Sequence, residues 1–68
     1  MTENMKLWLK ALYIEAAEEH RGAAQNERLW ALGSNNEEQI RLHEMNAAEN
    51  IAFSDMLTDM ANKIEEEF

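Results

Sequence analysis

The stretch Leu32-Gly33-Ser34-Asn35-Asn36-Glu37-Glu38 is the clearest interruption in a chain that otherwise has the composition of helix. Gly33 can adopt the left-handed conformation that ends a helix. Ser34, Asn35 or Asn36 can cap a following helix, and Ser34 with Glu37 has the spacing of a capping box. A turn this short makes its flanking helices antiparallel neighbours. The stretch therefore predicts an all-α antiparallel helical hairpin with its turn at 33–35.

The residues on either side of this turn favour two long helices in a single domain, 1–68. Thr2 is a suitable N-cap for a first helix over about 3–32, and the second helix is expected over about 36–66. The chain has no proline, no valine and few other β-branched residues, which argues against strands. A break near Gly22 would give three helices instead, but its alanine-rich surroundings favour a continuous helix in which Gly22 allows close packing.

The charge of the chain is concentrated in its second half. Residues 1–34 carry four basic and five acidic side chains, giving 4 − 5 = −1, whereas residues 35–68 carry two and nine, giving 2 − 9 = −7, which together make the formal charge of −8. Such a field repels nucleic acid and anionic membranes and attracts basic proteins. We therefore expect neither a nucleic-acid nor a membrane partner.

The second helix has a seven-residue apolar repeat of the coiled-coil type. One row consists of Ile40, Ala47, Ser54, Ala61 and Phe68, and the neighbouring row consists of His43, Asn50, Leu57 and Ile64. Folding at about Ser34 brings residue i near residue 68 − i, which sets Gln25 or Asn26 opposite His43. Polar residues in such a seam often fix register and oligomeric state, and this is the interpretation we favour for His43 and Asn50.

The first helix begins with a segment, 5–14, that is apolar on nearly every side except for Lys6 and Lys10. A helix of this kind is normally buried all round, which one partner helix cannot achieve. A chain of 68 residues without cysteine also lacks the core or disulfides for easy independent stability. We therefore predict a homodimer that forms a four-helix bundle, with a different protein partner and a monomer as the alternatives.

The predicted self-association interface lies at the open end of the hairpin, where the large apolar residues gather. Its members are Leu7, Trp8, Leu12, Tyr13, Ile14, Phe53, Met56 and Met60. Trp8 and Trp30 could also anchor a partner, since tryptophan is common at interface hot spots.

No motif in the chain predicts catalysis or a cofactor. A carboxylate-bridged metal site in a bundle needs a glutamate three residues before each histidine, but positions 17 and 40, before His20 and His43, hold alanine and isoleucine. Glu15, Glu19, Glu44 and Glu49 could still meet in a dimer, so a metal-binding bundle remains a minor alternative. No serine has a histidine at motif spacing, and we expect a non-enzymatic protein with no catalytic, cofactor or metal site.

The sequence thus favours a small self-associating module for protein interaction or regulation. An acidic inhibitor or nucleic-acid mimic that binds a basic protein is the main alternative. The segment 5–14 makes a poor signal peptide and is too short to span a membrane, so we expect a cytoplasmic protein. No segment carries a family signature, and a hairpin fold alone does not assign function.

Overall fold

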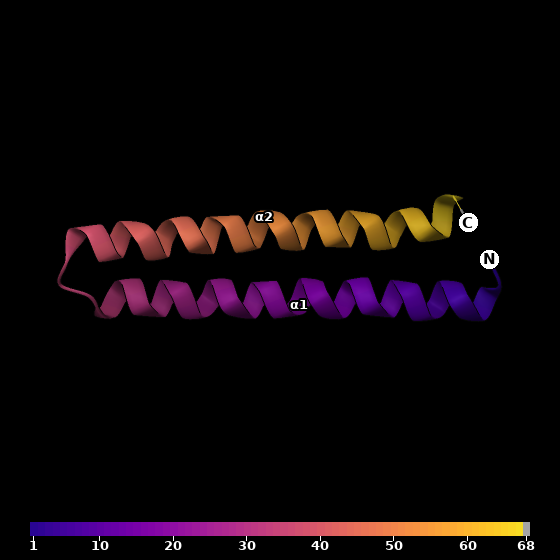
Figure 1. The fold of residues 1–68 in the computed structure, drawn as a ribbon, viewed down its shortest axis with the longest axis horizontal. Helices are drawn as coiled ribbons and strands as arrows, with labels where there is room; N and C mark the ends of the chain where they lie inside the picture. Colours follow the sequence, from indigo (N-terminus) through magenta and orange to yellow (C-terminus); the bar gives the residue numbers. More distant parts are fainter. Residues whose placement is uncertain (68) are drawn as a thin grey trace.

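The computed structural model describes residues 1–67, and the side chains of all of these except Glu65 and Glu67. Two helices, α1 (Glu3–Gly33) and α2 (Glu37–Glu67), lie side by side and antiparallel, with both chain termini at the same end (Figure 1). The pair forms a rod about 52 Å long. The predicted all-α antiparallel hairpin is confirmed.

Helix α1 begins as the sequence predicts and runs without interruption. The Oγ1 atom of Thr2 accepts a hydrogen bond from the backbone N–H of Met5 at 3.1 Å, so Thr2 is the N-cap. The alternative of a break near Gly22 is wrong, because α1 continues to Gly33. The proposed close packing at Gly22 is also wrong: this glycine is exposed, and a Cβ added to it would meet no atom within 4 Å.

The turn is built differently from the prediction. Gly33 is the last residue of α1, and no glycine of the described chain has a positive φ, so Gly33 is not a left-handed cap. Instead, Ser34 is extended and its N–H donates to the carbonyl of Ala31 at 3.3 Å. The cap of α2 is Asn36, whose Oδ1 accepts from the N–H groups of Glu38 and Gln39 at 2.9 and 3.2 Å.

Small residues line the seam between the two helices. The buried residues are Ala17, Ala24 and Ala31 on α1, and Ala47, Ser54, Leu57, Ala61 and Ile64 on α2. The α2 members belong to the two rows that the heptad pattern predicts, whereas Phe68 of the first row lies outside the described residues. Alanine and serine have short side chains, so these residues let the two backbones approach closely.

The register of the two helices is shifted by about three residues from the prediction. The hydroxyl of Ser54 donates to the carbonyl of Ala17 at 2.9 Å, so the numbers of facing residues add up to about 71 rather than 68. The prediction placed the fold at Ser34, but the turn occupies 34–36 and each helix runs one residue further than expected. The centre of the turn therefore lies one to two residues later in the chain than predicted.

Candidate self-association surface

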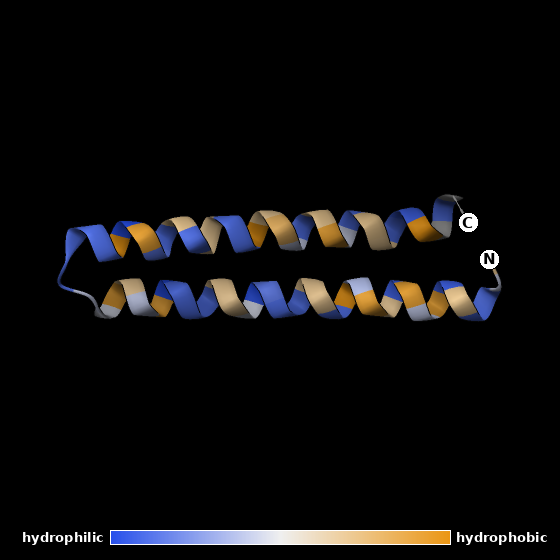
Figure 2. Cartoon of the chain, viewed as in Figure 1, coloured by the Kyte–Doolittle hydropathy of each residue, from blue (hydrophilic) through white to orange (hydrophobic). Residues whose placement is uncertain are grey.

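The open end of α1 has its polar and apolar residues in the reverse of the usual arrangement. Lys10 lies seven residues before Ala17, in the same row, and Lys6 lies in the neighbouring row of the seam. Both lysines therefore lie toward α2 and are half-buried. By contrast, Leu7 and Trp8 remain 65% and 67% exposed. The apolar side of this segment thus points away from the only helix of the hairpin that could cover it. Figure 2 shows hydrophobic residues gathered along the part of α1 nearest the N-terminus.

Two contacts between the helices distinguish the two broad faces of the rod. The ring of His20 lies 4.8 Å from that of Phe53 on one face. The Arg21 guanidinium donates to the Oγ1 atom of Thr58 at 3.1 Å on the other face. Because residues seven apart in a helix share a direction, the rows of Arg21 and Thr58 follow the second face. The row of Phe53 follows the first face, together with the α1 rows on the other side of the seam from Arg21. We call these the histidine face and the arginine face.

The histidine face comprises two rows of each helix. Its α1 residues are Leu9, Ala16, Ala23 and Trp30, flanked by Met5, Leu12, Glu19 and Asn26, and its α2 residues are Gln39, Asn46, Phe53 and Met60, flanked by Leu42, Glu49, Met56 and Lys63. Most are apolar, and the longest apolar stretch covers the half of the rod near the termini. The arginine face comprises Leu7, Ile14, Arg21 and Arg28 on α1, and Glu37, Glu44, Ile51 and Thr58 on α2.

Part-buried polar side chains lie beneath the histidine face, between the two helices, in the half nearer the turn. The Nδ1 atom of His20 lies 2.8 Å from Oδ1 of Asn50, and Nδ1 of His43 hydrogen-bonds Oε2 of Glu27. Both pairs join α1 to α2 and are part-buried. The partner expected for His43 was Gln25 or Asn26, which is wrong because of the register shift. Since each pair is satisfied only in one alignment of the helices, the two pairs favour this register.

Aromatic contact continues toward the turn. The ring of Trp30 lies 5.7 Å from that of His43, while Trp30 itself stays 58% exposed. Trp30 and the neighbouring Leu42 thus form a second apolar cluster on the histidine face, separate from the one near the termini. The prediction did not include this cluster in the interface. The signal that could have found it is the seven-residue row of Leu9, Ala16, Ala23 and Trp30 on α1.

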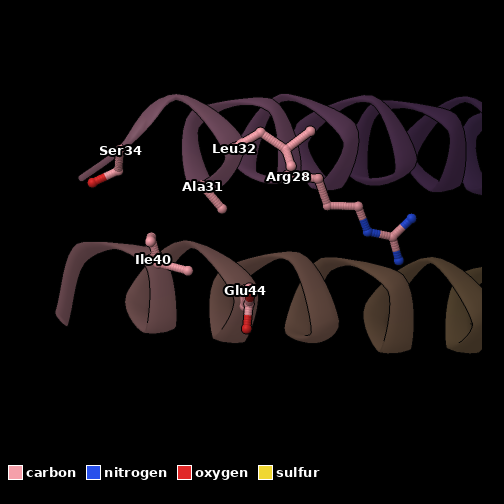
Figure 3. Close-up of a pocket in the computed structure, with 6 residues that line it drawn as sticks. All are labelled: Arg28, Ala31, Leu32, Ser34, Ile40 and Glu44. Atoms are coloured by element: carbon pink, nitrogen blue, oxygen red, sulfur yellow. The ribbon is translucent and has the colours of Figure 1, made fainter. Parts of the chain in front are cut away.

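The arginine face carries a groove beside the turn (Figure 3). It is lined by Arg28, Ala31, Leu32, Ser34, Ile40 and Glu44. The Arg28 side chain extends from α1 toward α2 along this groove. Charged residues from both helices therefore lie beside its apolar walls, which makes this face less suitable than the histidine face for a broad apolar contact.

The structure divides the predicted interface residues between several directions. Leu12, Phe53, Met56 and Met60 lie together on the histidine face, each between 37% and 58% exposed. Leu7 and Ile14 lie on the arginine face, and Trp8 points away from α2 between the two. Tyr13 is half-buried at the edge of the seam. One flat partner surface cannot contact all eight at once.

The four carboxylates considered for a metal site do not converge within the hairpin. Glu19 and Glu49 flank the histidine face, Glu44 lies on the arginine face, and Glu15 points outward. Over the part of the chain that the structure describes, no three histidine, aspartate or glutamate side chains gather closely enough to hold a metal ion.

No protein-family model, curated protein or solved structure matches this chain. Neither described helix is long and apolar enough to cross a membrane.

Proposed function

We propose that this protein is a non-enzymatic interaction module that self-associates through its histidine face to form a four-helix bundle. The observation that carries the proposal is the contrast between a thin core and an apolar surface. The only large apolar side chains buried among the described residues are Leu57 and Ile64, whereas Leu12, Met56 and Phe53 are about half exposed. A patch of this extent is unusual on a monomer and is typical of an interaction site.

The dimensions of the face suit a stable dimer. Between Cα atoms the rod measures 52 by 15 Å, so the face offers about 800 Å² to a partner, which is what each side contributes to a standard interface. Covering the exposed part of each large apolar side chain adds about 1 kcal/mol. Several such residues would supply the stability that two helices joined by an alanine seam lack.

Polarity also favours the histidine face over the arginine face. The rows of the histidine face next to the seam contain no charged residue, and its charged residues, Glu19, Glu49 and Lys63, lie at its edges. On the other face, Arg21, Arg28 and Glu44 would have to be desolvated. The absence of cysteine from the sequence suits a reducing compartment such as the cytosol, where we expect the bundle to act.

The test is the effect of a charge on each side of α2. Met56→Glu places a carboxylate in the proposed interface, where no basic residue lies one helical turn away, and Met45→Glu makes the same substitution on the outward side of the same helix. We expect the dissociation constant, measured by analytical ultracentrifugation, to rise at least about 100-fold for Met56→Glu, because a buried carboxylate without a partner is costly. Met45→Glu should leave it within about twofold. Equal effects of the two variants would contradict the proposal.

A second candidate, an acidic inhibitor of a basic protein, is supported by the exposure of the acidic side chains of α2. Glu38, Asp55, Asp59 and Glu66 are all exposed and lie on the outward side of the helix. In this function the outward side of the bundle would occupy a basic groove, and salt would weaken the complex.

This candidate is tested with the immobilised protein and a cell extract at low salt, followed by elution with a DNA duplex. A mimic should release basic nucleic-acid-binding proteins into the DNA eluate. A variant with Glu38→Gln, Asp55→Asn and Asp59→Asn should lose them while remaining dimeric. If the wild-type eluate contains no basic proteins, or the variant retains them, the acidic side serves only to keep the dimer in solution.

A further inference from the structure

We propose that the second copy packs on the histidine face with its turn at the same end as the turn of the first copy. In this arrangement α1 of each copy lies over α2 of the other. The inference rests on the proposed self-association and adds its orientation. It follows from how apolar and polar residues are distributed along the length of the face.

A two-fold axis can join two identical faces of a rod in two ways. An axis parallel to the rod keeps both turns at one end and sets α1 over α2 of the second copy. An axis across the rod puts the turns at opposite ends and sets α1 over α1 and α2 over α2. Both arrangements bury the full length of the face, so the buried area does not distinguish them.

The same-end arrangement matches residues of like polarity at most levels. Its exception is Lys63, which comes to the level of Leu9 but lies at the exposed edge, where its charged end can reach water. Each α1 residue then meets the α2 residue at its own level in the second copy, where the two residue numbers add up to about 71. Leu12 therefore meets Met60, and Trp30 meets Leu42. Asn26 meets Asn46, and their side-chain amides can hydrogen-bond each other. The face is thus complementary to a second copy of itself.

The opposite-end arrangement brings apolar residues against polar ones. With the axis through the middle of the rod, near residue 18 of α1, Met60 lies over Asn46 of the second copy and Met56 lies over Glu49. Leu9 lies over Asn26. Each polar group left without a partner would weaken association by about 5- to 150-fold, and symmetry repeats every mismatch.

Two effects favour the opposite-end arrangement, but both are smaller. The same-end arrangement brings Glu19 near Glu49 of the second copy, yet both are exposed at the edge, where such a repulsion is worth less than about fivefold. The opposite-end arrangement sets the large Leu12 over the small Ala23, which leaves a smaller gap between the two copies. Filling this gap strengthens association by about fivefold. The repeated polar mismatches outweigh these two terms.

The arrangement can be tested by measuring distances between spin labels, because the sequence contains no cysteine to interfere. Asn35→Cys places a nitroxide in the exposed turn, and Glu18→Cys places one on the outward side near the middle of the rod. Pulsed electron–electron double resonance then reports the distance between the two copies. Glu18 is the matched control, since a label at mid-rod gives a measurable distance below about 45 Å in either arrangement of four helices of this diameter.

We expect a distance of about 20–30 Å between the two turn labels, because facing helices lie about 10 Å apart. Labels at opposite ends of the rod would be about 50 Å apart, close to its 52 Å length. That result would overturn the orientation while leaving self-association intact. If the Glu18→Cys label shows no dipolar coupling at a concentration where the unlabelled protein is expected to be dimeric, self-association itself is contradicted.

Discussion

Replacing Ala24 by leucine should show how tightly the alanine seam is packed. Ala24 has no exposed surface, and Ala47, at the same level of α2, is 2% exposed. The substitution adds three carbon atoms at a point where both helices present only a methyl group. The helices must separate locally, or the leucine must adopt a strained rotamer. Separation would also disturb the hydrogen bond from Ser54 to Ala17, which lies about two helical turns further along the seam.

The expected loss of stability is large for a chain of this size. Overpacking a well-filled core costs about 1–3 kcal/mol. A domain of 68 residues has a total free energy of unfolding of about 3–10 kcal/mol. Leucine and alanine differ little in helix propensity, so the loss comes almost wholly from packing. For a domain of this length, each kcal/mol lowers the melting temperature by about 4–8 °C, which gives a decrease of about 4–24 °C.

Thermal unfolding followed by circular dichroism, at equal protein concentration, measures this decrease. The matched control is Ala11→Leu, which makes the same substitution at an exposed position of α1 and should shift the free energy of unfolding by less than about 0.5 kcal/mol. If Ala24→Leu proves as stable as the wild type, the seam is not closely packed and the reasoning about it is refuted.

Three further substitutions test local features of the hairpin. Asn36→Ala removes the cap of α2 and should cost about 1 kcal/mol in urea unfolding, whereas Asn35→Ala should be nearly neutral; equal losses would contradict the assignment of the cap. Gly22→Ala should stabilise α1 by about 0.5–1 kcal/mol, since the added Cβ meets nothing, and a loss of stability would show a contact that the hairpin lacks. Glu27→Ala leaves the part-buried His43 without its partner and should cost about 1–3 kcal/mol. An equal loss on truncating an exposed glutamate such as Glu18 would show that the hydrogen bond between Glu27 and His43 contributes nothing.

The hairpin and the seam of α2 could be predicted because each depends on local signals. Thr2 caps α1, and the polar residues after Leu32 interrupt an otherwise helical composition. The rows of Ala47 and Leu57 follow the seven-residue spacing that one buried stripe requires. A helix that packs against a single partner shows such a stripe clearly.

The seam of α1 was harder to predict because its open end is apolar on nearly all sides. The row of Ala17, Ala24 and Ala31 is regular, but Leu7 and Trp8 are larger apolar residues that point in other directions, so no single stripe stands out. Composition alone does not show that lysines occupy the seam rows there. The interface prediction therefore combined residues from both faces of the rod.

The turn and the register depend on details that composition does not determine. Gly33 can adopt a left-handed conformation, but the chain leaves α1 through an extended Ser34 instead. Any of the three polar residues after Gly33 could have capped α2. Because Asn36 is the cap, the centre of the turn lies later in the chain. A shift of this size replaces Gln25 or Asn26 by Glu27 as the partner of His43.

The molar mass of the protein in solution tests most directly the central claim that the hairpin is completed by a second copy. Multi-angle light scattering of the purified chain at tens of micromolar should give twice the chain mass of 7.9 kDa. A mass equal to one chain at that concentration, with α-helical circular dichroism retained, would contradict the claim.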